Sequence, residues 1–168
     1  MSELLDDSHL LKEKRGTTLM VLAILSWIWI GFTVITLVIS LADGKKSPEA
    51  LEEEKVRILE TATPEVIEVF GEDYITSTLS ILEISNEYFY TIQLLNLANI
   101  GIGFMAVFMM YKLRKKGYYL YIVYSILPIV ITLIFFETGF LINFGIIFNA
   151  VFGILFCSLY GAQVKRMS

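Results

Sequence analysis

The stretch TGFLINFGIIFNAVFGILFCSLYGAQV, residues 138–164, runs for 27 residues without an Asp, Glu, Lys, Arg or His. Three further windows share this property, residues 16–42, 88–111 and 117–136. A helix needs about 20 apolar residues to cross the hydrocarbon core of a bilayer, and each window has that length. The sequence therefore predicts an all-α integral membrane protein built as a four-transmembrane-helix bundle. The hydrophobic share of 56% agrees, since it exceeds that of soluble domains.

At 168 residues the chain fits one membrane domain, residues 1–168. The hydrophilic residues form two tails, 1–15 and 165–168, and three connections between the spans. These connections are a long loop at 43–87, a basic turn at 112–116 and a one-residue turn at 137. The first span is too long for the apolar region of a signal peptide, so we expect it to be kept as an anchor.

Lys and Arg near the ends of the spans predict the orientation of the bundle. Nine of them fall in the two tails and the 112–116 turn, which share one side of a four-span bundle. The other side has four, all in the 43–87 loop, where they accompany twelve acidic side chains. We therefore predict that both termini are cytoplasmic and that the acidic loop lies outside. A nucleic-acid partner is not expected, because such partners select basic surfaces.

The expected setting is a bacterial inner membrane. Cys157 is the one cysteine of the chain and lies inside the fourth span, so a disulfide framework is not available. Membrane lipid surrounds the spans in this setting, and the acidic loop faces the periplasm.

Helix-start signals occur twice in the long loop. Ser47, Pro48 and Glu49 combine an N-cap hydroxyl, a proline in the first turn and an acid, and they predict a helix from Pro48 to about Thr61. The same signal at Thr63 predicts a second helix from Pro64 to about Phe70. Apolar side chains recur at helical spacing in both and form a candidate partner surface: Leu51, Ile58, Val66, Ile67 and Phe70. The alternative is that these two helices only cap the bundle.

Two shorter segments are less clear. Residues 2–14 place leucines among charges and predict a short N-terminal interfacial helix on the membrane. Residues 74–87 are compatible with a helix or a strand, because β-branched and small polar residues alternate with a possible helical stripe.

Uncharged polar and small residues single out spans two and four. Carboxamides in these spans fall at matching depths and could bond across helices: Gln93, Asn96 and Asn99 in span two, Asn143 and Asn149 in span four. Span four also has a small-residue groove at four-residue spacing: Gly145, Asn149, Gly153, Cys157 and Gly161. We predict that span four is a packing centre, against span two or against a second copy of the chain.

The stretch MMYKLRKKGYYLYIVYSI, residues 109–126, resembles the basic turn and aromatic helix start of small four-span bacterial inner-membrane proteins of unknown function. This resemblance covers about a tenth of the chain and implies no site residues. Claudins and tetraspanins share the four-span layout with a long first outer loop. Their loop cysteines are absent here, so we set both aside.

Motifs for catalysis are missing from the sequence. It has neither HExxH nor GxSxG, the spans hold no acid or base, and His9 is the one histidine. We expect no enzyme, no catalytic residue, no metal site and no cofactor. The leading expectation is a non-enzymatic membrane subunit that contacts another membrane or periplasmic protein, or its own copy, through the acidic loop and the span-four groove. The alternative is a small oligomeric transporter or channel with a polar path between spans two and four.

Overall fold

The computed structural model describes residues 2–167, with side chains described for 16–64, 67–165 and 167. Helix makes up 88% of the chain, and the described residues contain no strand. In chain order the helices are α1 (Ser2–Asp43), α2 (Pro48–Thr61), α3 (Pro64–Phe70), α4 (Glu72–Glu87), α5 (Phe89–Tyr111), α6 (Lys115–Phe135), α7 (Phe140–Gly161) and the short 3-10 helix η1 (Val164–Arg166). The all-α prediction is confirmed.

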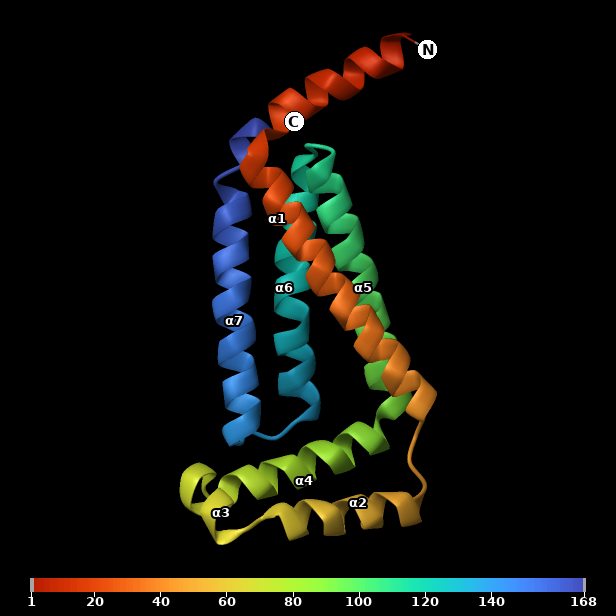
Figure 1. Ribbon diagram of the computed structural model, residues 1–168, viewed down its shortest axis with the longest axis vertical. Coiled ribbons are helices and arrows are strands. Elements are labelled where there is room, and N and C mark those ends of the chain that lie inside the picture. The colour runs from red at the N-terminus through yellow and green to blue at the C-terminus, as the bar shows by residue number, and fades with distance from the viewer. Residues whose placement is uncertain (1, 168) are drawn as a thin grey trace.

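Four helices are long and apolar enough to cross a membrane: Gly16–Asp43 within α1, and all of α5, α6 and α7. They are consistent with a multi-pass membrane protein. Both ends of the chain and the α5–α6 turn lie at one end of the bundle, whereas α2, α3, α4 and the α6–α7 connection lie at the other (Figure 1). These are called the inner and outer ends below, after the predicted orientation, which stays a prediction.

Helix α1 is broken at Gly16, whose backbone is non-helical with φ 65° and ψ 154°. Glycine tolerates a positive φ at no steric cost, so the chain can turn here between two helical stretches. Residues 2–15 leave the bundle at this point (Figure 1). Their backbone is helical, but the interfacial position proposed for residues 2–14 stays a prediction, and their side chains lie outside the described ones.

The long loop folds into three helices that lie across the outer end of the bundle (Figure 1). Helices α2 and α3 have the predicted bounds, and the Ser47 hydroxyl accepts a hydrogen bond from the Ala50 amide at 3.3 Å, as its N-cap role requires. Residues 74–87 are helical as part of α4. We call α2, α3 and α4 together the cap.

Ion pairs join α2 to its neighbours. The Lys55 ammonium lies 2.6 Å from a Glu83 carboxylate oxygen on α4 and 2.7 Å from Glu52 on α2. The hydrogen bond to Glu52, and then the one to Glu83, raises the pKa of Lys55 above its usual value. Lys46, in the connection from α1, pairs with Glu54. The cap is therefore tied both to itself and to the end of the first span.

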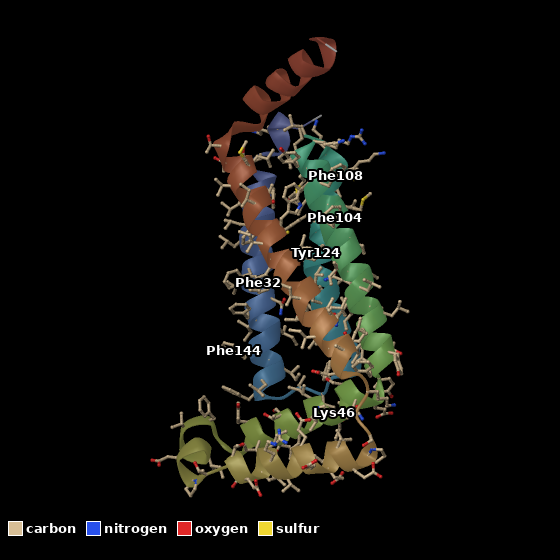
Figure 2. All side chains as sticks on the ribbon, turned by 45° about the vertical axis from the view of Figure 1, so that its right-hand side comes forward. Phe32, Lys46, Phe104, Phe108, Tyr124 and Phe144 are labelled. Carbon is tan, nitrogen blue, oxygen red and sulfur yellow. The ribbon has the colours of Figure 1, made fainter. Side chains whose placement is uncertain are left out.

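The α5–α6 hairpin is the tightest contact of the bundle. A Cβ atom added to Gly117 would lie 2.6 Å from the Met110 amide nitrogen and 2.7 Å from the Ala106 carbonyl oxygen. One added to Gly103 would lie 2.6 Å from the ring of Tyr124, which points from α6 toward α5 (Figure 2). Only glycine permits this approach of the two helices.

The inner end of the bundle is closed by tyrosines. Tyr160 of α7 is fully buried, and its hydroxyl lies 3.0 Å from the Ser26 hydroxyl of α1. The ring of Tyr121 of α6 lies beside it at a tilt of 55°, with ring centroids 4.8 Å apart, and the Tyr121 hydroxyl lies 3.5 Å from that of Ser26. Three helices therefore meet around two buried hydroxyl contacts of Ser26. Toward the outer end α1 and α7 diverge (Figure 1).

Candidate functional site

The carboxamides of spans two and four do not meet, so the prediction that they bond to one another is wrong. Helix α7 packs mainly against α6, which lies between it and α5. Gln93 of α5 instead donates from Nε2 to the Ser40 hydroxyl of α1, at 2.6 Å. Asn149 donates from Nδ2 to the Gly145 carbonyl of its own helix, at 2.9 Å. Matching positions along two spans do not say whether the two helices are neighbours.

The three remaining carboxamides have different surroundings. Asn99 is 7% exposed, and its Oδ1 has no hydrogen-bond partner among the described residues. Asn96 is half-buried and Asn143 is exposed. Of the five predicted carboxamides, Asn99 alone is buried in the bundle without a partner for its oxygen.

The small-residue groove of span four divides into two halves. In the inner half, a Cβ on Gly153 would lie 3.4 Å from the Ser125 side chain, and the Cys157 sulfur lies 3.7 Å from the Ser125 hydroxyl. Gly161 faces the Tyr118 hydroxyl in the same way, at 3.0 Å. This half packs on α6, so the predicted partner, span two, is corrected to span three. In the outer half, Gly145 has nothing within 4 Å.

Asn149 lies on the same helix face as two buried residues. Ile142 is seven residues before it and Tyr160 eleven after it, which places all three within about 20° of one another around α7. Ile142 is 8% exposed and Tyr160 0%, yet Asn149 between them is exposed. The cap covers this face at the outer end and α1 covers it at the inner end. Between these two levels α7 still packs on α6, but Asn149 is left exposed among the described residues.

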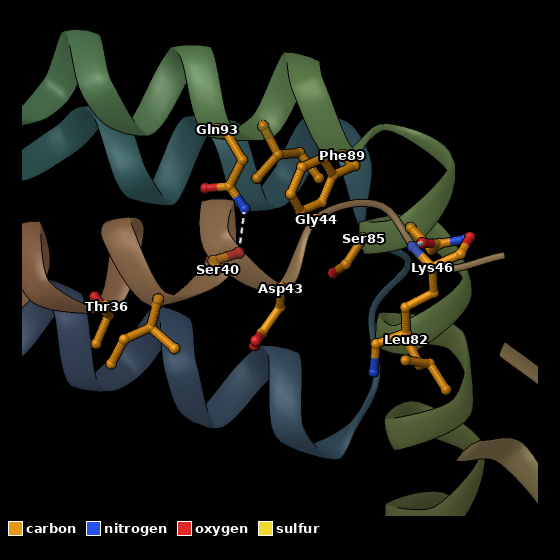
Figure 3. Close-up of a pocket in the computed structure, with 12 residues that line it drawn as sticks. Thr36, Ser40, Asp43, Gly44, Lys46, Leu82, Ser85, Phe89 and Gln93 are labelled. Carbon is orange, nitrogen blue, oxygen red and sulfur yellow. Dashed lines mark hydrogen bonds between the residues drawn. The ribbon is translucent and has the colours of Figure 1, made fainter. Parts of the chain in front are cut away.

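A pocket of about 440 Å³ lies where the outer ends of α1, α4 and α5 come together (Figure 3). Its lining is mixed, with polar and charged residues beside apolar ones: Thr36, Ile39, Ser40, Asp43, Gly44, Lys46, Leu82, Ser85, Asn86, Phe89, Ile92 and Gln93. Of these residues, Gln93 alone was a site residue predicted from the sequence. Among the other lining residues, Asp43 alone has a recognisable sequence feature, since it is the first charged residue after a long apolar span.

Hydrogen bonds of two carboxamide side chains connect the elements that line the pocket. The Gln93–Ser40 hydrogen bond joins α5 to α1 (Figure 3). Asn86 of α4 accepts from the Lys46 amide at 2.8 Å and donates to the Lys46 carbonyl at 3.3 Å, which fixes the connection after α1. The Asp43 carboxylate and the Ser85 hydroxyl have no hydrogen bond or ion pair with any described residue. These two groups are free to meet a ligand.

The predicted partner surface of the loop is partly used within the cap. Leu51, Ile58 and Ile67 are half-buried, and α2 and α3 both pack on α4. Phe70 is 49% exposed and its ring lies 5.1 Å from that of Tyr74, while the side chain of Val66 lies outside the described ones. The apolar residues most open on the cap are instead Val56, Leu59 and Val69, at 52%, 54% and 72% exposure.

Within the described part of the chain, no three His, Cys, Asp or Glu residues come together as metal ligands would. Comparison with known proteins finds no matching family, no matching curated protein and no matching solved structure.

Proposed function

We propose that the protein is a non-enzymatic subunit of a membrane complex, and that the outer half of α7 receives a membrane-spanning helix of another protein. The observation that carries this proposal is the exposed carboxamide of Asn149. It lies nine residues after the start of α7, about 14 Å into a hydrocarbon core about 30 Å thick. A polar side chain at that depth requires a polar partner or water.

The Asn149 amide nitrogen already bonds within its own helix, whereas no described residue donates to its Oδ1. An unpaired amide oxygen facing hydrocarbon costs about 1–3 kcal/mol, judged from protein mutations. A hydrogen bond from a neighbouring helix returns about 0.6–2 kcal/mol. Gly145, one turn away, has open space beside its backbone and would let that helix approach closely. The partner is therefore a helix with a hydrogen-bond donor at mid-depth.

The cap supplies a second contact on the same side of the membrane. Val56, Leu59 and Val69 are exposed among the carboxylates of a loop with twelve acids and four bases. Exposed apolar side chains on a strongly acidic loop favour a partner segment that carries both apolar and basic residues. The proposed partner thus combines a spanning helix with a basic extracytoplasmic segment.

The alternative of a transporter or channel needs a polar path between α5 and α7. Because α6 separates these helices, the carboxamides of the two spans do not line a common path within one chain. We therefore keep the subunit proposal as the leading one.

Three leucine variants of α7 test the proposal in full-length protein extracted from its own membrane in mild detergent. Gly145→Leu and Asn149→Leu should release a co-purifying membrane protein and leave the melting temperature unchanged. Gly153→Leu should lower the melting temperature, because Gly153 already contacts Ser125. A lone, monodisperse wild-type chain would contradict the proposal, and a complex made only of this chain would replace the partner by a second copy.

A further inference from the structure

We infer that the pocket between α1, α4 and α5 binds the headgroup of an aminophospholipid, with the lipid ammonium against Asp43. The pocket is at the right level for a headgroup. Asp43 ends the first candidate span and Phe89 begins the second, so the pocket lies at the boundary between hydrocarbon and headgroups. Its volume of about 440 Å³ falls within the range of roughly 300–1,000 Å³ seen for small-molecule sites.

The charges at the pocket favour a cation. Asp43 is at the C-terminal end of α1, where the helix dipole is negative, and no basic residue occupies the last turn of that helix. The C-terminal end of α4 is negative and lies beside the N-terminal end of α5, which is positive, so these two helix dipoles oppose each other. The negative C-terminal end of α1 is then the net dipole charge at the pocket. Lys46 also lines the pocket, but its ammonium pairs with Glu54. The exposed Asp43 carboxylate has no ion-pair partner among the described residues.

The ligand's cation should carry N–H donors. The Asp43 carboxylate accepts hydrogen bonds, and so can the Ser85 hydroxyl. Asp43 is on α1, Ser85 is on α4, and both line the pocket (Figure 3). A primary ammonium can donate to both, whereas a quaternary ammonium cannot donate at all. A hard metal cation is a poor fit, because such ions take six or more oxygen ligands and the pocket has one carboxylate.

Apolar surface continues from the pocket along the first span. Ile39 lines the pocket and is 55% exposed, and Ile35 and Phe32 follow on α1 at 56% and 62%. A ligand with its ammonium at Asp43 can therefore lay an acyl chain along α1. This continuity is what selects a lipid over a soluble amine.

The test measures the melting temperature of the purified full chain in mixed micelles that contain one added lipid. Ethanolamine phospholipid should raise the melting temperature more than choline phospholipid does, because only the former donates N–H bonds. Asp43→Asn should weaken the apparent affinity for the ethanolamine lipid by about tenfold or more, the scale of a charge-assisted hydrogen bond. Asp73→Asn is the matched control, since Asp73 is an exposed acid of the cap away from the pocket, and it should keep the full response.

A second variant, Leu82→Trp, fills the pocket while it leaves Asp43 in place, and it should also abolish the response. Leu82→Trp tests the same proposal if Asp43→Asn does not fold. Equal responses to ethanolamine and choline lipids would overturn the proposal, as would an undiminished response in both pocket variants. If soluble phosphoethanolamine raised the melting temperature at the same concentration as the lipid, the lipid assignment would be overturned and the ligand would be a soluble amine.

Discussion

The substitution Gly117→Ala should increase the distance between α5 and α6 and destabilise the hairpin. The added Cβ would lie 2.6 Å and 2.7 Å from backbone atoms of Met110 and Ala106, whereas ordinary contacts begin near 3.4 Å. Backbone atoms of a packed helix cannot turn aside as a side chain can, so the two helices must separate by about 0.8 Å. Overpacking of this kind costs about 1–3 kcal/mol, against a gain of up to about 1 kcal/mol from the helix propensity of alanine. We expect a net loss of about 1–2 kcal/mol.

Reversible unfolding in mixed detergent micelles measures this loss. Tryptophan fluorescence is a suitable signal, because the ring of Trp27 packs 5.5 Å from that of Tyr111 on α5. Gly145→Ala is the matched control, since a methyl group there meets nothing within 4 Å, and it should be neutral or stabilising by up to about 1 kcal/mol. The reasoning is refuted if Gly117→Ala unfolds at the same denaturant concentration as Gly145→Ala.

Three further outcomes follow from individual contacts. Ser26→Ala and Tyr160→Phe should each cost about 0.6–2 kcal/mol, and the double variant should cost less than their sum, because both remove the same hydrogen bond at 3.0 Å. Gly139→Ala should destabilise the docking of α7 on the cap through a clash with the Ser77 hydroxyl, and adding Ser77→Ala should restore the melting temperature. Lys55 has a raised pKa, so its contribution to stability is present below the unfolded value of 10.5 and is lost as the pH rises through the folded value. Protease cleavage of α2 should accordingly increase at strongly alkaline pH, and Lys55→Met should show that increased cleavage already at neutral pH.

Hydrophobic length was enough to predict the spans, because lipid imposes one requirement on every residue of a crossing helix. Capping signals were similarly local, and Ser47 and Pro48 therefore predicted the start of α2. Residues 74–87 were ambiguous because their surroundings, which the sequence does not reveal, decide between helix and strand.

The site was harder to predict because it depends on which helices are neighbours. Asn149 and Asn99 are at similar positions along their spans, but α6 lies between the two helices. The composition of α6 does not indicate that it takes this place. The pocket was missed for the same reason. Asn86 and Ser40 carry no signal of their own, and they became relevant only when α4 was found to lie under the ends of α1 and α5.

The contact between Ser26 and Tyr160 also bears on how the chain is assembled during synthesis. It joins residues 134 positions apart, so it cannot form until the last of the four spans has been made. The α5–α6 hairpin, by contrast, needs only a short turn and can form as soon as both helices enter the bilayer. Until α7 arrives to close the inner end, the Ser26 hydroxyl has only the longer contact, 3.5 Å, to the Tyr121 hydroxyl of α6.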